Sequence, residues 1–317
     1  MDQTLEQVFD RLADGRAHSG QQLARTLGVS RNAIWKHIEA LRDLGLEVPA
    51  RSGEGYQLTT AIQRPSMDSI RQRLDPPIAL DLRFLVDSTN ACLNRERSDH
   101  PPPRALIAET QTQGRGRRQR TWLSPPGAGL YLSIAWRFES GLTGLSALSL
   151  VTGIAVAAVL KSHGLEATKL KWPNDLWVND RKLGGCLIEV SGSAEGPCEA
   201  VTGVGLNLNL GKFDHIDQPW TDLARHGIDP NRNALYADLI NAITRAYAEL
   251  DRTGFSAFEP GWSELDALRD RRVKVIGRAR EPLEGIARGV DSQGRLLLEA
   301  IGGIEAIGSG EVSVRRC

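Results

Sequence analysis

The residues with the clearest chemical potential lie in the stretch ETQTQGRGRRQRTW, at 109–122. Two glycines and four arginines stand close together there: Gly114, Arg115, Gly116, Arg117, Arg118 and Arg120. Clustered cations repel one another, so a folded protein keeps them only in contact with solvent or with an anion. Because glycine lets the backbone approach an oxyanion and arginine supplies charge-assisted hydrogen bonds to it, the stretch predicts a phosphate-binding loop. An exposed, solvated loop is the alternative.

The two common nucleotide-binding loops are absent from the sequence. GRGRRQ lacks the third glycine of a dinucleotide fingerprint, and GLNLNLGKF, at 205–213, has one residue too many for a P-loop and a phenylalanine at the magnesium-binding position. Arginine-glycine tails that bind RNA occur as long disordered repeats, whereas this stretch lies between two strand-like runs. Any nucleotide site in this chain must therefore be of a different design.

Three further stretches supply polar groups. DSTN, at 87–90, ends a strand-like run with a carboxylate, two hydroxyls and an amide, which suits either a small polar ligand or a capped turn. KWPND, at 171–175, ends a strand at its proline. NDRKLGG, at 179–185, places Lys182 before a glycine pair that lets another group come close. Taken singly, each stretch is explained equally well as a structural turn.

The elements that would position these groups are mostly strands. From residue 82 onward, strand-like runs alternate with proline, glycine and Asn-Asp turns. Two helical patterns interrupt them, at 145–160 and 234–251, and the first is too short and too rich in hydroxyls for a membrane span, which favours a buried helix. From 272, short strands with tight glycine turns indicate a small SH3-like β-barrel. The fold class is therefore α+β, with a central mixed sheet.

The N-terminal region predicts a winged helix-turn-helix. A first amphipathic helix carries its apolar residues at helical spacing: Leu5, Val8, Phe9 and Leu12. A second helix begins after Ser19, with Gln22 three residues on, and ends at Gly28. A third begins after Ser30, and VPARSGEGYQL, at 48–58, has the pattern of a hairpin wing. Two short helices joined by such a turn are typical of domains that read the major groove of DNA.

Charge is concentrated on this helix pair. Between residues 15 and 38 there are four lysines or arginines and no acidic residue, although the first 64 residues as a whole are balanced. This distribution favours phosphate contacts over a protein-binding role, which is the alternative. The residues expected at DNA are Ser30, Arg31, Asn32, Trp35 and Lys36.

Composition limits the remaining possibilities. The chain has 317 residues, with 39 basic and 39 acidic side chains, so overall charge identifies no partner, and its length suggests two or three domains. Four scattered cysteines, without metal-ligand spacing, favour a reducing compartment over disulfides or zinc. The acidic start MDQTLEQVFD lacks the apolar segment of an export signal. We therefore expect a cytoplasmic protein with no membrane partner.

In combination and in this order, the motifs resemble those of the bifunctional biotin-protein ligases that are also biotin operon repressors. The resemblance covers essentially the whole chain and depends on DSTN, QTQGRGRR, SPPGAGLYLS, KWPNDL, DRKLGG with the LIE that follows it, and GVGLNLN, behind the winged helix. It implies three domains, at 1–64 (DNA-binding), 65–268 (ligase) and 269–317 (C-terminal). A lipoate or octanoate ligase and a DNA-binding biotin sensor without catalysis are the alternatives.

The resemblance also implies a reaction and its partners. Members of this family join biotin and ATP, with Mg²⁺, into biotinyl-5′-adenylate and pass biotin to one lysine of a carboxylase carrier domain. The adenylate is also the signal, because the adenylate-bound homodimer binds operator DNA. The small C-terminal domain is expected to help bind ATP and the carrier.

By resemblance, individual positions receive roles. Biotin contacts are expected from Ser88, Thr89, Asn90, Gln111, Arg115, Gly116, Arg117 and Lys182. ATP or adenylate contacts are expected from Gly114, Arg115, Arg117, Trp122 and Asn174, with Trp220 as a second wall for the adenine. Catalytic roles fall to Arg117, Lys182 and Asp175, and no side chain is expected to bind a metal directly. Arg118 and Arg120 are expected to lie farther out.

The sequence departs from the family pattern at two places. Gln119 stands where many relatives have glycine, and the glutamine stiffens the end of the arginine loop, the stretch at 114–120. The segment 210–220 lacks the basic start associated with the loop that covers the adenylate. These departures concern nucleotide affinity and the coupling of ligand binding to dimer formation.

Overall fold

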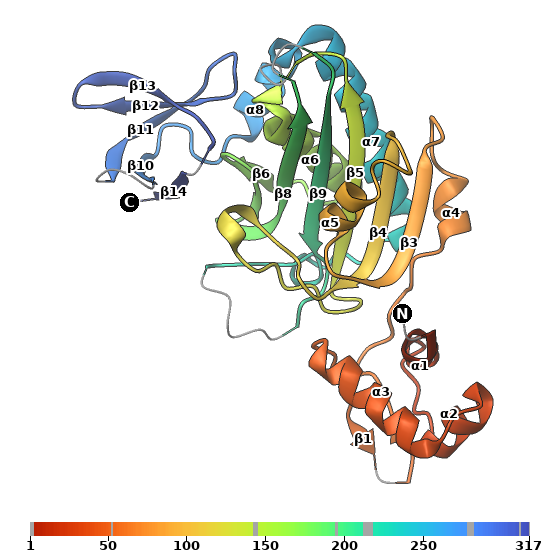
Figure 1. The fold of residues 1–317 in the computed structure, drawn as a ribbon. Coiled ribbons are helices and arrows are strands. Elements are labelled where there is room, and N and C mark those ends of the chain that lie inside the picture. The colour runs from red at the N-terminus through yellow and green to blue at the C-terminus, as the bar shows by residue number, and fades with distance from the viewer. Residues whose placement is uncertain are drawn as a thin grey trace.

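The structure is a computed structural model (Figure 1). It describes the chain except for residues 1–2, 52, 142–144, 194–195, 212–217, 278–281, 311 and 317. A small helical unit, a large central sheet with helices and a separate small sheet follow one another along the chain, as Figure 1 shows.

The N-terminal unit is three helices followed by a hairpin. Its elements are α1 (Gln3–Leu12), α2 (Gly20–Leu27), α3 (Arg31–Asp43), β1 (Ala50–Arg51) and β2 (Gly55–Tyr56). The hydroxyl of Ser19 accepts a hydrogen bond from the N–H of Gln22 at 3.3 Å, and Ser30 Oγ accepts one from Ala33 at 3.1 Å. These N-caps set where α2 and α3 begin. The predicted winged helix-turn-helix is confirmed.

The central sheet has seven strands. In spatial order they are β3 (Ala79–Val86), β4 (Arg104–Gln111), β5 (Gly129–Phe138), β9 (Cys198–Asn207), β8 (Arg181–Gly192), β7 (Asp175–Val178) and β6 (Thr168–Lys171). β3 and β4 run parallel, and the other neighbours run antiparallel. The sheet is therefore mixed, as the sequence predicts.

Helices cover the two faces of this sheet unequally. The long helices α6 (Leu148–Ser162) and α7 (Arg232–Thr253) share the main apolar core with one face, and the short α5 (Thr89–Arg95) packs on the other (Figure 1). α6 is the predicted buried helix. The remaining helical elements are α4 (Met67–Arg71), α8 (Glu259–Leu265), η1 (Arg117–Gln119), η3 (Ala224–His226) and η4 (Phe255–Phe258). In the described residues, no helix is long and apolar enough to cross a membrane.

The C-terminal unit is a five-stranded antiparallel sheet. Its strands are β10 (Arg272–Ile276), β11 (Leu283–Val290), β12 (Leu296–Ala300), β13 (Gly303–Ile307) and β14 (Ser313–Arg316). Val273 and Val314 are buried in the same apolar core as the central sheet, and the indole N–H of Trp172 donates to the carbonyl of Gly294 at 3.0 Å. The unit is therefore packed against the central sheet and is not merely connected to it by the chain.

No helix or strand lies between β2 and α4 or between α8 and β10. The expected domain boundaries, at 64/65 and 268/269, fall in these two connecting segments. Their exact positions stay predictions.

Candidate functional site

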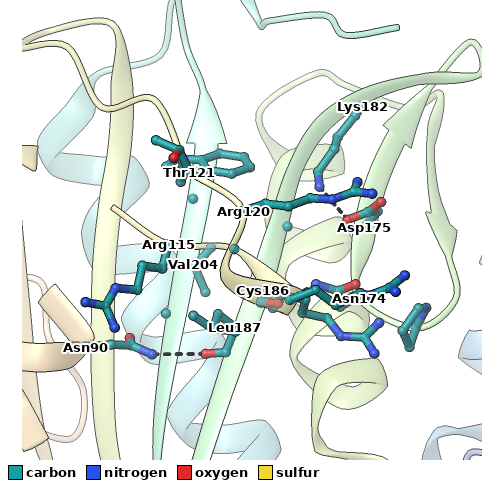
Figure 2. Close-up of a pocket in the computed structure, with 18 of the residues that line it drawn as sticks. Asn90, Arg115, Arg120, Thr121, Asn174, Asp175, Lys182, Cys186, Leu187 and Val204 are labelled. Carbon is teal, nitrogen blue, oxygen red and sulfur yellow. Dashed lines mark hydrogen bonds and ion pairs between the residues drawn. The ribbon is translucent and has the colours of Figure 1, made fainter. Parts of the chain in front are cut away.

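A pocket lies over β8 and β9, on the face of the sheet that carries α5. The N-terminus of α5, the arginine loop, the KWPND turn and β14 of the C-terminal unit border it. Figure 2 shows Asn90 at one end and Lys182 with Asp175 at the other, with the arginine loop between them. The residues assigned above to biotin, to adenylate or to catalysis all contribute to its lining, except Gly114 and Trp220.

One end of the pocket is a hydrogen-bonded group of neutral side chains. Gln111 Oε1 accepts from the N–H of Thr89 at 2.9 Å and from its hydroxyl at 3.2 Å, while Gln111 Nε2 donates to Ser124 Oγ at 3.0 Å. Ser88 caps α5 by accepting from the N–H of Ala91 at 3.5 Å. The start of α5 is therefore fixed to the end of β4 before any ligand arrives.

Asn90 is held in the same network. Its Oδ1 lies 2.6 Å from Ser133 Oγ, which is also 2.6 Å from Thr89 Oγ1, and its Nδ2 donates to Glu189 Oε2 at 2.8 Å. A Cβ on Gly203 would lie 2.6 Å from Asn90 Oδ1, so only glycine leaves room for this amide. Ser133, which is fully buried in β5, ends the SPPGAGLYLS motif, but it was assigned no role from the sequence because a single serine in a strand does not reveal its partner.

The arginine loop is shaped by its glycines and by its contacts. A Cβ on Gly114 would lie 2.6 Å from the carbonyl oxygen of Trp122, whereas Gly116 has open space, with Arg120 O as the nearest group at 3.7 Å. Arg118 and Gln119 adopt left-handed backbone conformations, with φ of 57° and 59°. Such angles favour glycine, so the glutamine at 119 occupies a backbone conformation in which the glycine expected from the resemblance would be less strained.

The arginines of the loop differ in surroundings. Arg115, Arg118 and Arg120 are exposed at the pocket mouth. Arg117 is half-buried and donates to backbone carbonyls of the C-terminal unit: that of Gly310 at 2.6 Å and that of Ser309. Burial lowers the pKa of its guanidinium. In this structure the loop is therefore joined to the C-terminal unit through Arg117.

The other end of the pocket contains an ion pair. Lys182 Nζ lies 2.7 Å from Asp175 Oδ1 and 5.5 Å from the centre of the Trp122 ring. Asn174, in the turn between β6 and β7, donates through Nδ2 to the carbonyl of Cys186 at 2.6 Å. Cys186 itself lines the floor, and burial raises the pKa of its thiol to about 12, so it is no nucleophile at neutral pH.

The two candidate adenine walls lie in different places. Trp122 covers Gly205, where a Cβ would lie 2.7 Å from the indole ring, so a glycine is required beneath it. Trp220 instead packs under the guanidinium of Arg225, 3.8 Å from its ring centre, and does not line the pocket. Part of the neighbouring segment, 212–217, lies outside the described residues. The expectation for Trp122 is thus the better supported of the two.

The charge of the lining is strongly positive. The cations are Arg115, Arg117, Arg118, Arg120, Lys171 and Lys182, and Asp175 is the only carboxylate among the described lining residues. Lys171 was not singled out from the sequence, although it begins the KWPND motif. No cluster of three or more metal-binding side chains occurs in the described chain. The pocket can thus bind a neutral polar group at one end and a polyanion at the other.

The third helix of the N-terminal unit presents the residues expected at DNA. Arg31, Asn32, Trp35 and Lys36 are exposed on α3, and half of the Trp35 surface, 51%, is accessible. Ser30 is the N-cap of this helix, so its hydroxyl is already occupied by the backbone. A row of exposed polar and aromatic side chains at the start of the second helix of the pair suits groove contact.

Comparisons with known proteins agree with this division of the chain. Residues 4–57 match an HTH domain, 82–207 match the biotin/lipoate A/B protein ligase family and 270–315 match the biotin protein ligase C-terminal domain. Fold and site together define a protein ligase of the biotin/lipoate class, joined to a helix-turn-helix domain.

Two relatives and one solved structure narrow the class. The bifunctional ligase/repressor BirA of Salmonella typhimurium is 43% identical, over 97% of this chain and 96% of the relative, and that of Escherichia coli is 42% identical, over 96% and 95%. A biotin protein ligase from Aquifex aeolicus, solved in complex with biotin and ATP, is 30% identical to this chain and superposes on it with a TM-score of 0.65. The match covers 75% of this chain and 99% of that protein. The chain belongs to the family of bifunctional biotin ligase/repressors, and the predicted family, fold class and enzyme class are confirmed.

Proposed function

We propose that this protein joins biotin to ATP, releases pyrophosphate and transfers biotin from the resulting biotinyl-5′-adenylate to a lysine of a carboxylase carrier domain. The observation that carries the proposal is the polarity of one pocket, with a neutral hydrogen-bonding end at Asn90 and a cationic end at Lys182. A ligand with a neutral ureido ring, an apolar chain and a carboxylate fits that sequence of environments. The relative solved with biotin and ATP supports the same substrates.

The first step brings two anions together. A biotin carboxylate oxygen forms a bond to the α-phosphorus as the bond from that phosphorus to the pyrophosphate oxygen breaks, and the electron pair leaves with pyrophosphate. Positively charged groups fixed in place are worth most in such a step, because they need not reorganise as charge moves. Lys182 and Arg117 are the proposed source of this stabilisation, and Trp122 the proposed wall for the adenine.

In the second step the neutral amine of the carrier lysine attacks the acyl carbon, and the bond from that carbon to the phosphate oxygen breaks with AMP as the leaving group. The proton that the new amide nitrogen loses passes to water. Asp175 is proposed to take part by orienting Lys182 and the incoming amine, since its carboxylate already bonds the Lys182 ammonium at 2.7 Å. Mg²⁺ is proposed to arrive with the nucleotide, because it is usually bound through one or two carboxylates and substrate phosphates. Asp175 is the carboxylate available in the described lining.

The helix-turn-helix unit is proposed to make the protein a biotin-dependent repressor. Adenylate-bound dimers would place two copies of α3 on operator half-sites, spaced by whole turns of about 34 to 36 Å. A gel shift with operator DNA, with and without biotin and ATP, tests this part. Equal DNA affinity in both conditions would remove the regulation and leave the ligase.

The ligase is tested by incubating the full-length protein with a carrier domain, biotin and ATP, followed by an avidin blot. Labelling that needs both small molecules and is lost when the carrier lysine is changed to arginine supports the proposal. Labelling with lipoate or octanoate in place of biotin, read by mass, would favour the rival acyl ligase. Biotin-dependent DNA binding without any carrier labelling would favour a sensor that has lost catalysis.

A further inference from the structure

Lys171 is a cation that lines the pocket and has no role in the proposed reaction as described so far. It ends β6, its side chain is half-buried, and its Nζ lies 4.7 Å from the centre of the Trp177 ring. In the part of the chain that the structure describes, its ammonium has no recorded hydrogen bond or ion pair. Burying an ammonium group without such partners is costly, and a cation–π contact offsets only part of that cost.

The charges around Lys171 make this cost larger. The charges of Lys182, Arg120 and Arg315 repel its ammonium, whereas the carboxylate of Asp175 attracts it. Burial, together with these cations, lowers the pKa of Lys171. Asp175, however, already bonds Lys182. An anionic ligand is the arrangement that would compensate all of these cations at once.

Strand pairing shows where such a ligand would lie. Across four neighbouring strands, Lys171 pairs with Asp175, Asp175 with Gly185 and Gly185 with Gly205. Directly paired residues in antiparallel strands share a face, so these four form one row across the sheet, roughly 14 Å long at about 4.8 Å per strand. Trp122 covers Gly205 at one end, and Lys171 stands at the other.

The two glycines leave the middle of this row without side chains. A nucleotide whose base lies against Trp122 would therefore extend its phosphates across Gly185 toward Asp175 and Lys171. Lys182, within 5.5 Å of the Trp122 ring, comes first along this path, which places it nearer to the α-phosphate. Lys171 comes last.

We propose that Lys171 binds the β- and γ-phosphates of ATP and holds them as they depart as pyrophosphate, an inference that rests on the adenylation reaction proposed above. No proton needs to move for this role. The ammonium stays protonated while the bond to the α-phosphorus breaks, and it stabilises the charge that the pyrophosphate oxygen gains. Lys171 is then required for the first half-reaction and not for the second, in which no pyrophosphate takes part.

The test separates the two half-reactions in the full-length protein. Lys171→Met keeps most of the side-chain volume against Trp177 and removes the charge. Biotin-dependent exchange of pyrophosphate into ATP reports the first half-reaction, and transfer of biotin from synthetic biotinyl-5′-adenylate to a carrier domain reports the second. Lys169→Met is the matched control, because Lys169 lies on the same strand, is exposed and bonds the carbonyl of Glu264.

For Lys171→Met we expect the KM for ATP to rise and the exchange rate to fall, each by about tenfold to a hundredfold, the effect of losing a charge-assisted hydrogen bond. Inhibition by free pyrophosphate should weaken to the same degree. The KM for biotin and the transfer rate should stay within about twofold, and Lys171→Arg should recover most of the exchange.

An unchanged KM for ATP with normal exchange would overturn the proposal and leave Lys171 as a packing residue. Equal losses in exchange and transfer would also overturn it, because they would place Lys171 in the general structure of the site. If the unsubstituted protein showed no biotin-dependent exchange at all, the adenylation reaction itself would fail. The three outcomes are distinguishable in one set of measurements.

Discussion

Lys182 Nζ and Asp175 Oδ1 lie 2.7 Å apart at the point where β7 and β8 are paired across a bulge. Both side chains are mostly buried, with 17% and 14% of their surfaces exposed. The ion pair neutralises the charge of Asp175, the one carboxylate among the described lining residues, and it leaves two ammonium hydrogens of Lys182 free to bond a ligand. The bulge brings Lys182 opposite Trp177 and so fixes where along β8 its ammonium points.

Lys182→Ala is predicted to reduce adenylate synthesis far more than biotin binding, because Lys182 is proposed to lie beside the reacting bond, at the end of the pocket opposite Asn90. A loss of at least about a hundredfold in synthesis is expected if one charge-assisted contact is made only in the transition state. Isothermal titration with biotin and a pyrophosphate-release assay measure the two quantities. Equal losses in both would move Lys182 away from the reaction centre.

Arg117→Ala is predicted to weaken retention of the adenylate. The change removes the hydrogen bonds to Gly310 and Ser309 that join the arginine loop to the C-terminal unit, each worth about 1.5 to 3 kcal/mol where the donor is charged. The expected result is faster adenylate dissociation, by about tenfold or more, together with faster hydrogen exchange in residues 112–121. Arg118→Ala, which removes an exposed neighbour, should change both much less. Unaltered dissociation in Arg117→Ala would contradict this role.

Gly205→Ala is predicted to displace Trp122. The added Cβ would lie 2.7 Å from the indole ring, too close for a real contact, so the ring must move or the strand must shift. We expect a change in tryptophan fluorescence and a rise in the KM for ATP that exceeds the rise for biotin. Gly302→Ala is the control, since no atom lies within 4 Å of its added Cβ. A normal KM for ATP in Gly205→Ala would show that Trp122 is not the wall of the adenine site.

Arg64→Met is predicted to destabilise the folded protein. Arg64, in the segment between α1–α3 and the ligase sheet, donates through Nε to both oxygens of Glu109, at 3.0 and 3.1 Å, and also bonds Glu6 and Asp10 of α1. Glu109 is 5% exposed. Removing its partner leaves a buried charge alone, which costs about 3 to 5 kcal/mol. Thermal or urea unfolding measures the loss.

The loss should depend on pH in a definite direction. Burial already raises the pKa of Glu109, and Arg64 opposes that shift, so the pKa rises further in Arg64→Met. When the pKa of a carboxyl group is higher in the folded state than in the unfolded state, the contribution of that group to the stability of the fold falls as the pH rises. The deficit of the variant relative to the unsubstituted protein should thus be larger at neutral pH than near the ordinary glutamate pKa of about 4.3. The double variant Arg64→Met/Glu109→Met should be less destabilised than Arg64→Met. A deficit that is flat with pH would contradict the buried charge.

Local sequence signals predicted local structure well. Ser19 was expected as an N-cap, and the third helix was expected to begin after Ser30; both serines are N-caps, because capping depends on residues within one turn. The apolar run at 145–160 was expected as a buried helix and forms most of α6, from Leu148. The pairing of β5 with β9, whose partner residues are at least 60 positions apart, was not predictable from spacing, because it depends on which buried faces meet after the chain has collapsed.

The candidate site was predictable in its motifs and not in its contacts. DSTN, the arginine loop and KWPND do converge on one pocket, as the resemblance implies. Ser133 and Glu189, which hold Asn90, end the SPPGAGLYLS and LIE motifs on β5 and β8, but no role was assigned to either residue because the motifs do not show which side chains meet. The bonds of Arg117 to Gly310 and Ser309 span almost two hundred positions and depend on how the C-terminal unit packs. No local pattern contains that information.

The pocket is proposed to form biotinyl-5′-adenylate from two anions, biotin and ATP. The most direct measurement incubates the full-length protein with biotin, ATP and Mg²⁺ in the absence of carrier, removes unbound molecules, denatures the protein and identifies the released ligand by mass spectrometry. We expect the denatured protein to release biotinyl-5′-adenylate, and we expect an equal amount of pyrophosphate in the solution. Recovery of unreacted biotin and ATP, or of neither, with no pyrophosphate formed, would contradict it.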